Sequence, residues 1–304
     1  MLDVSLVGTG GMMPMPQRFL SSMLLRTNGN LLLVDCGEGT QVSLKNIGWG
    51  FKNIDAILFT HFHADHIAGL PGMLLAIANS GRTKDLKLFG PKGLIFIVEG
   101  LRRIAQELPF NIVYTELDDD KKSLFSIDGV DITAIGSKHS VRCLAYCFEI
   151  KRKGRFDVEK ANALKIPKNK WSILQKSGKL DFNGKTYTSD MVMGKNRKGI
   201  KLTYCTDSRP FPALTSMAEN SDLFICEGMY GENEKKPKAI ENKHMLFSEA
   251  AKMAKKANVK ELWLTHFSPS LSEPSEFIEN ATDIFENTVV GTDGMKKRIL
   301  FEEQ

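Results

Sequence analysis

The sequence lacks several patterns that would assign a function directly. None of its 304 residues belong to a run of about 18 apolar residues, the length that spans a membrane. The motifs G-x-x-x-x-G-K-[ST] and G-x-S-x-G are absent, so nucleotide-hydrolase and serine-hydrolase interpretations have no support. Met1–Val7 lacks the basic start and long apolar core of a signal peptide. We therefore expect a cytoplasmic protein that does not contact a membrane.

Cysteine is scarce and scattered. The five cysteines are odd in number and form no C-x-x-C pair: Cys36, Cys143, Cys147, Cys205 and Cys226. We expect reduced thiols, because a disulfide framework or a cysteine-zinc site needs paired spacing. With 42% hydrophobic and 25% charged residues, the chain has the composition of a globular protein with one large α/β domain or two small ones.

Histidine is also rare, yet three of the six histidines lie in the stretch Thr60–His66, which reads T-H-F-H-A-D-H. His61 and His63 are two residues apart in an extended segment, so their side chains point the same way and can share one metal ion. Asp65 and His66 follow where the chain turns, and can reach a second ion. The alternative is a loop of solvated histidines, but the H-x-H-x-D-H pattern favours a metal site.

Further metal-binding side chains follow strand-like runs. Four such runs each deliver one potential ligand near their C-terminal end: 56–60 before His61, 130–135 before His139, 201–206 before Asp207, and 261–265 before His266. An α/β scaffold gathers its site residues at strand ends, because the sheet holds the loops that carry them. We expect these four side chains to meet at one site.

Positive charge is concentrated in residues 151–201, which we call the basic arm. This segment has fifteen Lys and Arg against four Asp and Glu, a net charge of +11, whereas the whole chain is only +5. A basic insertion in an otherwise acidic chain is typical of a polyanion-binding surface. A solvated, poorly ordered loop is the alternative, but interleaved apolar residues such as Phe156, Trp171 and Leu174 favour a folded arm.

Glycines and apolar periodicity give weaker signals. The cluster Gly8–Gly11 resembles a nucleotide-binding loop, but G-x-G-x-x-G fails at Met13. A tight turn carrying backbone amides is the better interpretation, and an anion-binding role within the active site stays open. Apolar spacing predicts helices over 66–78, 93–107 and 248–257.

The H-x-H-x-D-H loop with the later His139, Asp207 and His266 resembles the metallo-β-lactamase superfamily. Over nearly its whole length, the chain further resembles the ribonuclease Z family of tRNA 3′-processing endonucleases. The matching stretches are D-C-G-E-G-T-Q at 35–41, H-I-A-G-L-P-G at 66–72, G-P-K-G-L at 90–94, G-R-F-D-V-E-K-A at 154–161 and L-T-H-F-S-P at 264–269. The stretch at 154–161 is the most telling, since it resembles the start of the protruding arm with which that family grips the tRNA body.

The resemblance implies an α/β fold, a four-layer αβ/βα sandwich with two mixed sheets face to face, formed by a single domain over 1–304. It implies that the basic arm protrudes as a tRNA-binding exosite. It further implies precursor tRNA as partner, and a homodimer in which the arm of one subunit presents tRNA to the site of the other. The arm residues implied in substrate binding are Gly154, Arg155, Phe156, Lys160, Lys168 and Lys170.

The resemblance also implies two Zn²⁺ per subunit, with Mn²⁺ or another divalent metal as the alternative. The implied ligands are His61, His63 and His139 for one ion, Asp65, His66 and His266 for the other, and Asp207 as the bridge. Two such ions can activate a shared water for metal-hydroxide attack on a phosphodiester, which would leave a 3′-OH on the tRNA. Asp65 would also accept the proton of that water. Asp35 fits a partner that orients a ligand histidine, with a helix-start role as its alternative.

The leaving 3′-oxygen needs a proton, and one histidine remains. His244 matches the family's His-Ser-Thr-like or His-Met-Thr-like motif beside the scissile phosphate, and Glu227 matches the Glu of a His-Glu-Ala-Thr segment that pairs with this histidine. Such a pair suits a general acid. Without the resemblance, His244 would be taken as a surface histidine. The chain departs from the family pattern at Cys226, Met229, Met245–Leu246 and Asn169–Trp171.

Two other classes of function are the alternatives. A metal-dependent phosphodiesterase or other hydrolase of small substrates would carry a short loop in place of the basic arm. A redox di-iron protein would carry Glu in place of His63, and a metal-stabilised RNA-binding protein would not need the complete ligand set. We therefore predict a zinc-dependent endoribonuclease that removes the 3′ trailer from precursor tRNA.

Overall fold

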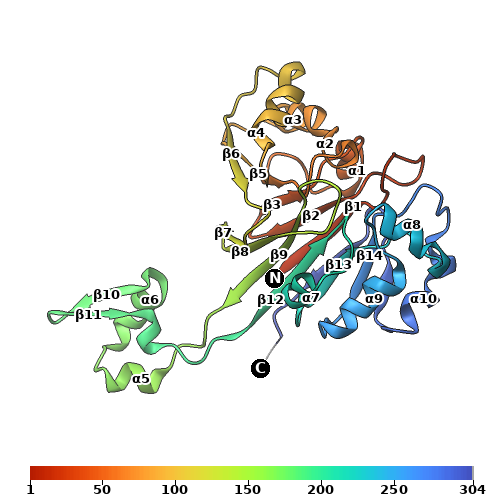
Figure 1. Cartoon of the computed structure of the whole chain (residues 1–304). Coiled ribbons are helices and arrows are strands. Elements are labelled where there is room, and N and C mark those ends of the chain that lie inside the picture. The colour runs from red at the N-terminus through yellow and green to blue at the C-terminus, as the bar shows by residue number, and fades with distance from the viewer. Residues whose placement is uncertain (303–304) are drawn as a thin grey trace. The chain divides into compact units, whose positions relative to one another are not determined.

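The computed structural model describes residues 1–302, which form two compact units. The first unit comprises Met1–Glu149 and Ile200–Leu300. The second comprises Ile150–Gly199 with the described residues Phe301 and Glu302, and contains nearly all of the basic arm. Figure 1 shows the elements of both units in chain order.

The first unit is built on two seven-stranded mixed sheets. In the first sheet, β3 to β6 run parallel and β16, β1 and β2 are antiparallel to their neighbours. Its order is β16 (Lys296–Ile299), β1 (Leu2–Gly8), β2 (Ser22–Thr27), β3 (Asn30–Val34), β4 (Ile54–Leu58), β5 (Leu86–Pro91) and β6 (Ile112–Leu117). The order of the second sheet is β15 (Thr288–Val290), β14 (Leu262–Thr265), β13 (Leu223–Glu227), β12 (Arg197–Cys205), β9 (Leu144–Arg152), β8 (Val130–Gly136) and β7 (Ser123–Ile127).

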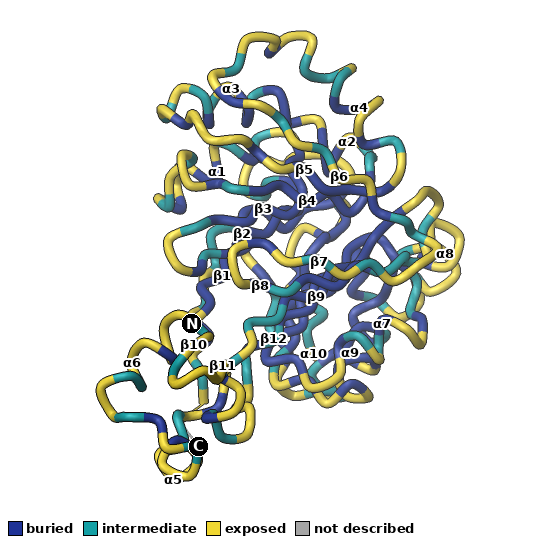
Figure 2. The backbone as a smooth tube through the Cα atoms, turned by 90° about the vertical axis from the view of Figure 1, so that its left-hand side faces the viewer, coloured by how far each residue is buried: buried dark blue, intermediate teal, exposed yellow. Residues whose placement is uncertain are grey.

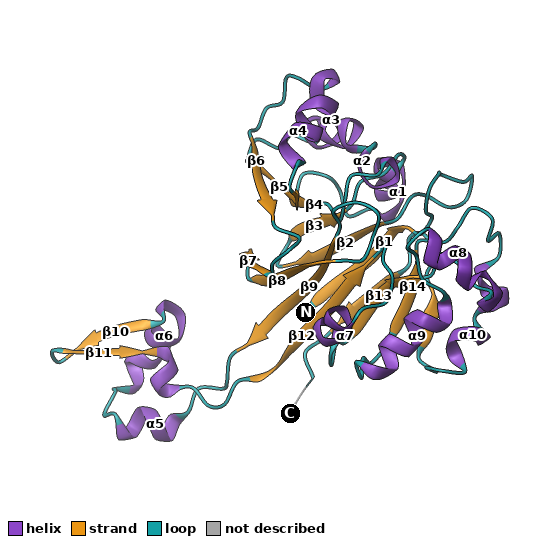
Figure 3. Cartoon of the chain, in the orientation of Figure 1, coloured by secondary structure: helices purple, strands orange, loops and turns teal. Residues whose placement is uncertain are grey.

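Helices cover the outer face of each sheet (Figure 3). Those that follow strands of the first sheet are α1 (Thr40–Ile47), α2 (Ala64–Ile67), α3 (Leu70–Asn79), α4 (Leu94–Leu101) and the 3₁₀ turn η1 (Arg102–Ile104). Those of the second sheet are α7 (Pro212–Ala218), η3 (Asn233–Lys235), α8 (Lys236–Glu241), α9 (Phe247–Lys256), η4 (Pro274–Phe277) and α10 (Glu279–Thr282). Two mixed sheets with flanking helices confirm the predicted four-layer sandwich. Within residues 1–302, every helix is too short or too polar to cross a bilayer.

Apolar side chains explain this layering. On the first sheet, Leu44 of α1, Leu74 of α3 and Val98 of α4 join one buried cluster with strand residues such as Leu33. On the second sheet, the alanines of α9 let it pack closely, in a cluster that also contains Phe224. The central strands are accordingly buried, while edge strands such as β6 and β7 and the outer sides of the helices are more exposed (Figure 2). A helix with one apolar face on a sheet is the arrangement that the 3.6-residue period dictates.

Two of the three predicted helices differ in extent from the prediction. The helix expected over 93–107 covers only Leu94–Leu101 and continues as a 3₁₀ turn to Ile104. The chain leaves helical geometry at Ala105, with φ of −135° and ψ of 57°, and Pro109 disfavours helical backbone again at Leu108. The stretch 66–78 forms two helices, α2 and α3, which are separated at Gly69. The helix predicted over 248–257 is α9, one residue earlier.

The second unit has secondary structure and a core of its own. Its elements are α5 (Val158–Ala163), α6 (Lys168–Ser177), β10 (Lys179–Phe182), β11 (Lys185–Thr188) and η2 (Ser189–Val192). Asn183 and Gly184 join the two strands, both with positive φ, as a two-residue hairpin turn requires. The core consists of Ala161, Ile166, Leu174, Leu180 and Val192. The apolar residues of the basic arm therefore build a folded unit.

Candidate active site

Two imidazoles from the loop after β4 meet a third from the loop after β8. His61 Nε2 lies 3.0 Å from His63 Nδ1, and His139 Nε2 lies 3.3 Å from the same atom. The second carboxylate oxygen of Asp207, Oδ2, is 3.7 Å from both His61 Nε2 and His139 Nε2. These four side chains form one group that could hold a metal ion.

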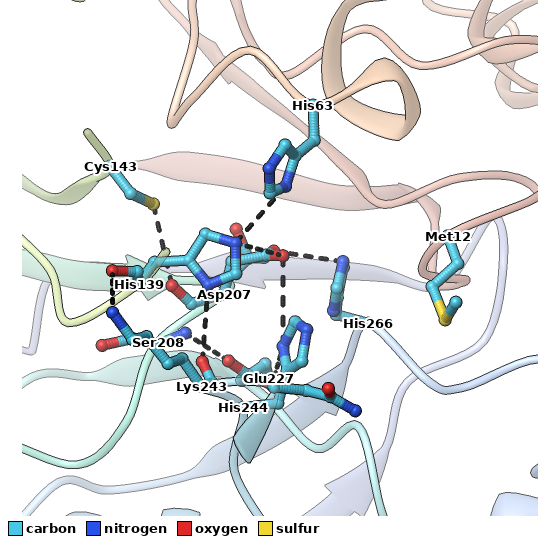
Figure 4. A network of polar contacts seen from close by, with 12 residues as sticks. Met12, His63, His139, Cys143, Asp207, Ser208, Glu227, Lys243, His244 and His266 are labelled. Carbon is cyan, nitrogen blue, oxygen red and sulfur yellow. Dashed lines mark hydrogen bonds and ion pairs between the residues drawn. The ribbon is translucent and has the colours of Figure 1, made fainter. Parts of the chain in front are cut away.

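A second group lies on the other side of Asp207. His66 Nε2 is 3.2 Å from His266 Nε2, and Asp65 Oδ2 is 3.5 and 3.6 Å from these two atoms. Asp207 Oδ1 lies 3.2 Å from His66 Nε2 and 3.1 Å from His266 Nε2. Asp207 therefore directs one carboxylate oxygen at each group, and Figure 4 shows His139, His244 and His266 gathered around it.

The donor atoms fit a binuclear metal site. Tetrahedral zinc, with bonds of roughly 2.0–2.1 Å to nitrogen, places neighbouring ligand atoms about 3.3 Å apart, and the facing nitrogens have this spacing. Imidazole nitrogens that face each other so closely cannot all satisfy one another by hydrogen bonding. Asp207 Oδ1, moreover, is buried without a hydrogen-bond partner among the described residues. Both observations are consistent with cations held by the two groups.

Local backbone conformation supports a functional site. Asp35, Asp207 and His266 adopt left-handed conformations, with φ of 60°, 45° and 59°. Such conformations cost non-glycine residues on the order of 1 kcal/mol or more each, and they concentrate at functional sites. Each of the three residues lies one or two positions after the end of a strand. The chain thus turns sharply where it must present these side chains.

Asp35 contacts His66, a member of the second group, at the ring nitrogen that points away from that group. Its carboxylate lies 2.9 Å from His66 Nδ1 and accepts hydrogen bonds from the backbone N–H and the hydroxyl of Thr60. Burial raises the pKa of Asp35, while His66 and Thr60 oppose that rise. The contact fixes the orientation of His66, so that its Nε2 faces the second group. A helix-start role is wrong, because α1 begins at Thr40 after Gly39.

His244 and Glu227 form a pair at the edge of the site. His244 Nδ1 is 3.1 Å from Glu227 Oε2, and Glu227 also accepts hydrogen bonds from the backbone N–H groups of Ser208 and Met245. Burial lowers the pKa of His244, but the carboxylates of Glu227, Asp207 and Asp65 outweigh it and raise this pKa to about 9. With Nδ1 engaged, Nε2 is the ring nitrogen left for a substrate.

A pocket of about 380 Å³ connects these groups. Its lining residues include Met12, His63, Asp65, His139, Asp207, His244 and His266. The imidazoles in this pocket therefore face a common space that is open to solvent. The pKa of Asp65 lies below its ordinary range, because His266 and His66 outweigh the effect of burial, and the carboxylate stays ionised. An ionised carboxylate beside a metal group can bind a cation or accept a proton.

The glycine-rich turn after β1 contributes to the site. The N–H of Gly11 donates to Phe267 O, and a Cβ atom on Gly11 would lie only 2.8 Å from Cε1 of His266. The N–H of Met12 donates to Asp65 Oδ2 at 2.7 Å. The expected tight turn is thus present, and one of its amides serves Asp65. The glycine cluster was visible in the sequence, but its contact with His266 was not.

Two departures from the family pattern lie against each other. Cys226 and Met245 are fully buried, with Sγ 3.9 Å from Sδ. Met229 and Leu246 likewise share one buried cluster with Tyr230. The side chains after His244 therefore belong to the core. They do not line the pocket.

The arm residues that were predicted to bind substrate divide into two kinds. Phe156 packs on Trp171, with ring centroids 5.2 Å apart, and a Cβ on Gly154 would meet Gly194 O at 2.1 Å, so both serve the arm's own fold. Lys160 is exposed and donates to Met193 O. Arg155 and Lys168 are exposed, and Lys170 is half-buried.

Comparison with known proteins places these features in a family. Ribonuclease Z of Clostridium acetobutylicum is 53% identical over 309 residues, which cover 99% of each chain. Ribonuclease Z of Clostridium kluyveri is 55% identical over 303 residues, and that of Agathobacter rectalis is 54% identical over 303 residues, with complete coverage of both chains in each case.

Solved structures share the fold. The short form of human tRNase Z has a TM-score of 0.71 at 22% identity, covering 98% of this chain and 100% of that one. The metallo-β-lactamase fold protein YhfI from Bacillus subtilis has a TM-score of 0.69 at 20% identity, covering 97% and 98%.

The family model for the anti-Pycsar protein Apyc1 matches residues 2–157, about half of the chain. This range contains the His61–His66 loop and His139 but neither Asp207 nor most of the basic arm. The chain shares this half with the Apyc1 family. The full-length relatives place the whole chain more narrowly, because their similarity extends through Asp207, His266 and the arm. The chain belongs to the ribonuclease Z family of metallo-β-lactamase-fold endoribonucleases, which hydrolyse phosphodiesters in tRNA 3′ processing.

Proposed function

We propose that this protein removes the 3′ trailer from precursor tRNA with two zinc ions and the His244–Glu227 pair. One observation carries the proposal: Asp207 directs Oδ1 at one group of ligands and Oδ2 at the other, while His244 Nδ1 lies 4.0 Å from the same carboxylate. A carboxylate shared by two ligand groups, with a potential acid beside it, is an arrangement that suits phosphodiester hydrolysis at two metals.

The ligand set favours zinc, with Mn²⁺ or another divalent metal as the alternative. Imidazole and carboxylate ligands suit zinc, and the cysteines of the described chain are buried and free. The proposed ligands are His61, His63 and His139 for one ion, Asp65, His66 and His266 for the other, and Asp207 for both. When bound, two zinc ions supply Lewis-acid chemistry, since they acidify a water and neutralise the phosphate.

Side chains of the protein then accept and donate the protons of the reaction. Asp65, whose Oδ2 is oriented by the N–H of Met12, accepts the proton of the attacking water. His244 Nε2 donates a proton to the leaving 3′-oxygen, which remains on the tRNA as a hydroxyl. Glu227 holds the imidazole by Nδ1 and stabilises its protonated form. The products are a tRNA with a free 3′-OH and a trailer with a 5′-phosphate.

The basic arm binds the body of the tRNA in this proposal. Its net charge of +11 suits a phosphate backbone, and its own core lets it present charges on a defined surface. Its exposed cations include Arg155, Lys160 and Lys168. Gly154 and Phe156 shape that surface from within.

A homodimer belongs to the same proposal, with the arm of one subunit serving the site of the other. The first unit supports this with an exposed apolar surface, where Phe96 of α4 is 82% exposed and Ile104 of η1 is 80% exposed. Phe96 lines one depression with Ile95, Ile97 and Leu101, and exposed apolar side chains that gather on one surface are typical of a protein interface. The free cysteines further favour the cytoplasm as the place of action.

The test is cleavage of a 3′-extended precursor tRNA by purified protein, with Asp65→Ala and a chelator-treated sample as controls. A single cut after the discriminator nucleotide, absent in both controls, is the expected result. Intact RNA from protein that holds two metals per chain would overturn the proposal. In that case, hydrolysis of bis(p-nitrophenyl) phosphate would favour the small-substrate alternative.

A further inference from the structure

The segment Lys243–Leu246 is held by several polar contacts. Glu227 binds both the imidazole of His244 and the N–H of Met245, each at 3.1 Å. Lys243 donates from Nζ to His139 O, and its own carbonyl lies 3.4 Å from His139 Nδ1. These contacts fix the ring and the start of the segment, but not the carbonyl of His244 or the N–H of Leu246.

Arg209 and Glu249 fix the remaining two groups. Arg209 Nη1 donates to the carbonyl of His244 and also to Glu249 Oε2, at 2.8 Å for the latter, while Nη2 donates to Glu249 Oε1. Glu249 Oε2 accepts the N–H of Leu246 at 3.1 Å. The forked ion pair therefore holds both ends of the peptide His244–Leu246. Arg209 and Glu249 are largely buried, at 20% and 12% side-chain exposure, which strengthens a charged hydrogen bond.

Arg209 also belongs to the loop that carries Asp207. The N–H of Arg209 donates to Lys138 O, and the N–H of Lys138 donates to the hydroxyl of Ser208. His139 follows Lys138 directly. Arg209 thus links the two loops that carry the proposed metal ligands Asp207 and His139 to the loop of His244.

We propose that Arg209, braced by Glu249, is a positioning residue that sets the distance between His244 Nε2 and the leaving oxygen of the phosphate at the metal site. This inference rests on the proposed function. Groups on the Asp207 loop position the phosphate, and groups on the His244 loop position the imidazole that acts as the acid. Arg209 and Glu227 together hold the two loops in register, since Glu227 accepts the N–H groups of Ser208 and Met245. Misplacement of a catalytic group by 1 Å can cost about 100-fold in rate.

The geometry of the guanidinium matters here. It reaches the carbonyl of His244 and both oxygens of Glu249 at once, because its donors form a rigid planar fork. A lysine at position 209 keeps the charge but cannot make all three bonds. Arg209→Lys should therefore displace His244 without removing the positive charge from the site.

The experiment compares two substrates with different leaving groups. Precursor tRNA has an alkoxide leaving group that needs a proton, whereas p-nitrophenolate leaves bis(p-nitrophenyl) phosphate without one. We expect Arg209→Lys to lower single-turnover RNA cleavage about 10- to 100-fold. Hydrolysis of bis(p-nitrophenyl) phosphate should change less than about 3-fold, and the variant should keep the wild-type metal content. Glu249→Gln, which retains an acceptor for Leu246, should show the same selectivity with a smaller loss.

Arg82→Lys is the matched control. Arg82 is 3% exposed and also joins loops, through bonds to Asp55 and to three backbone carbonyls, but it lies outside the pocket. Its substitution should lower the melting temperature and leave both rates unchanged. If Arg209→Lys slowed both substrates equally or lost metal, the residue would have only a structural role and the proposal would be overturned.

A double-mutant cycle gives the second readout. If Arg209 acts through His244, Arg209→Lys should have little further effect on RNA cleavage in a His244→Ala background. Independent, multiplying losses would overturn the proposal. A wild-type protein that hydrolyses only bis(p-nitrophenyl) phosphate would instead contradict the proposed function itself, so the two failures are distinct.

Discussion

His244 Nδ1 lies 3.1 Å from Glu227 Oε2, and both side chains lie in the same unit as every proposed metal ligand. The two residues come from the end of β13 and from the loop before α9, 17 positions apart. Glu227 is completely buried and His244 lines the pocket. The pair therefore extends from the protein interior to the pocket. The charged carboxylate of Glu227 is buried, and the imidazole of His244 faces the space where a substrate would bind.

Glu227→Gln should lower RNA cleavage and shift its pH dependence. The neighbouring carboxylates raise the pKa of His244 to about 9, so its acid form persists into alkaline solution. A neutral amide stabilises the imidazolium less, and the alkaline limb of the pH–rate profile should move to lower pH. At neutral pH we expect a loss of about 10-fold or more. The measurement is single-turnover cleavage between pH 6 and 10. Glu261→Gln, which breaks an ion pair with Lys297 away from the site, is the control and should leave the profile unchanged.

Gly11→Ala should disturb the metal centre more than the fold. Gly11 has no positive φ, so alanine is acceptable to its backbone, but the new Cβ would lie 2.8 Å from His266 Cε1. His266 is fully buried and must shift to relieve the contact. We expect metal affinity to fall about 10-fold or more, as for changes beside a ligand, with only a small loss of melting temperature. Gly100→Ala, where a Cβ meets nothing within 4 Å, should retain wild-type affinity. Equal affinities in the two variants would contradict the prediction.

The proposed ligands and the fold were predictable because they leave local signals. The H-x-H-x-D-H spacing and the strand-end positions of His139, Asp207 and His266 depend only on short stretches of chain, and the structure brings these residues together. Apolar periods likewise located α3, α4, α9 and the end of α2, whereas the other helices of the first unit and both helices of the basic arm were not predicted. The exact helix ends were missed because the chain leaves helical geometry at Ala105 and the helical hydrogen bonding is interrupted at Ala68 and Gly69.

The contacts that hold the site could not be predicted in this way. Arg209 contacts His244 and Glu249, which are 35 and 40 positions away in the sequence. Gly11 follows a strand of the first sheet and lies against His266, which follows a strand of the second. A sequence shows an arginine or a glycine at these positions, but not which atom it will face. The tertiary arrangement of the loops decides these partners. The second-sheet topology, in which β12 to β15 run parallel, brings the loops together at one edge.

Asp35→Asn should weaken metal binding without exposing the site. The carboxylate orients His66 through Nδ1 at 2.9 Å and also holds Thr60. An amide of the same shape can keep one of these hydrogen bonds, but it has no negative charge with which to stabilise the His66 ring when that ring binds a cation. We expect a loss of about 10- to 100-fold in zinc affinity, the usual cost of removing such a partner. Titration with a competing chelator measures it. Asp55→Asn, at the ion pair with Arg82, is the control, and an unchanged affinity for Asp35→Asn would rule out the orienting role.

Substitutions on the basic arm should weaken tRNA capture and spare the chemistry. Lys168→Ala with Lys170→Ala removes two positive charges from the start of α6 without touching the arm's core. The affinity for precursor tRNA should fall, and the slope of log affinity against log salt should decrease by about 0.7–0.9 for each lost phosphate contact. Hydrolysis of bis(p-nitrophenyl) phosphate should stay constant. Lys255→Ala with Lys256→Ala, two exposed charges on α9, is the matched control and should leave the salt slope unchanged.

Cys226 and Met245 should be coupled, because both depart from the family pattern and their sulfur atoms lie 3.9 Å apart in a fully buried position. Cys226→His restores the residue expected from the family. In this chain, however, it would place an imidazole against a thioether and the apolar cluster around Phe247. Burial of a larger polar group without a partner should cost about 2 kcal/mol or more of unfolding free energy.

Met245→Ser in the same protein supplies a hydroxyl and space, so the double variant should recover part of that loss. Denaturant unfolding of the single and double variants measures the coupling. Additive losses would contradict the prediction, since they would show that the two positions are not energetically coupled.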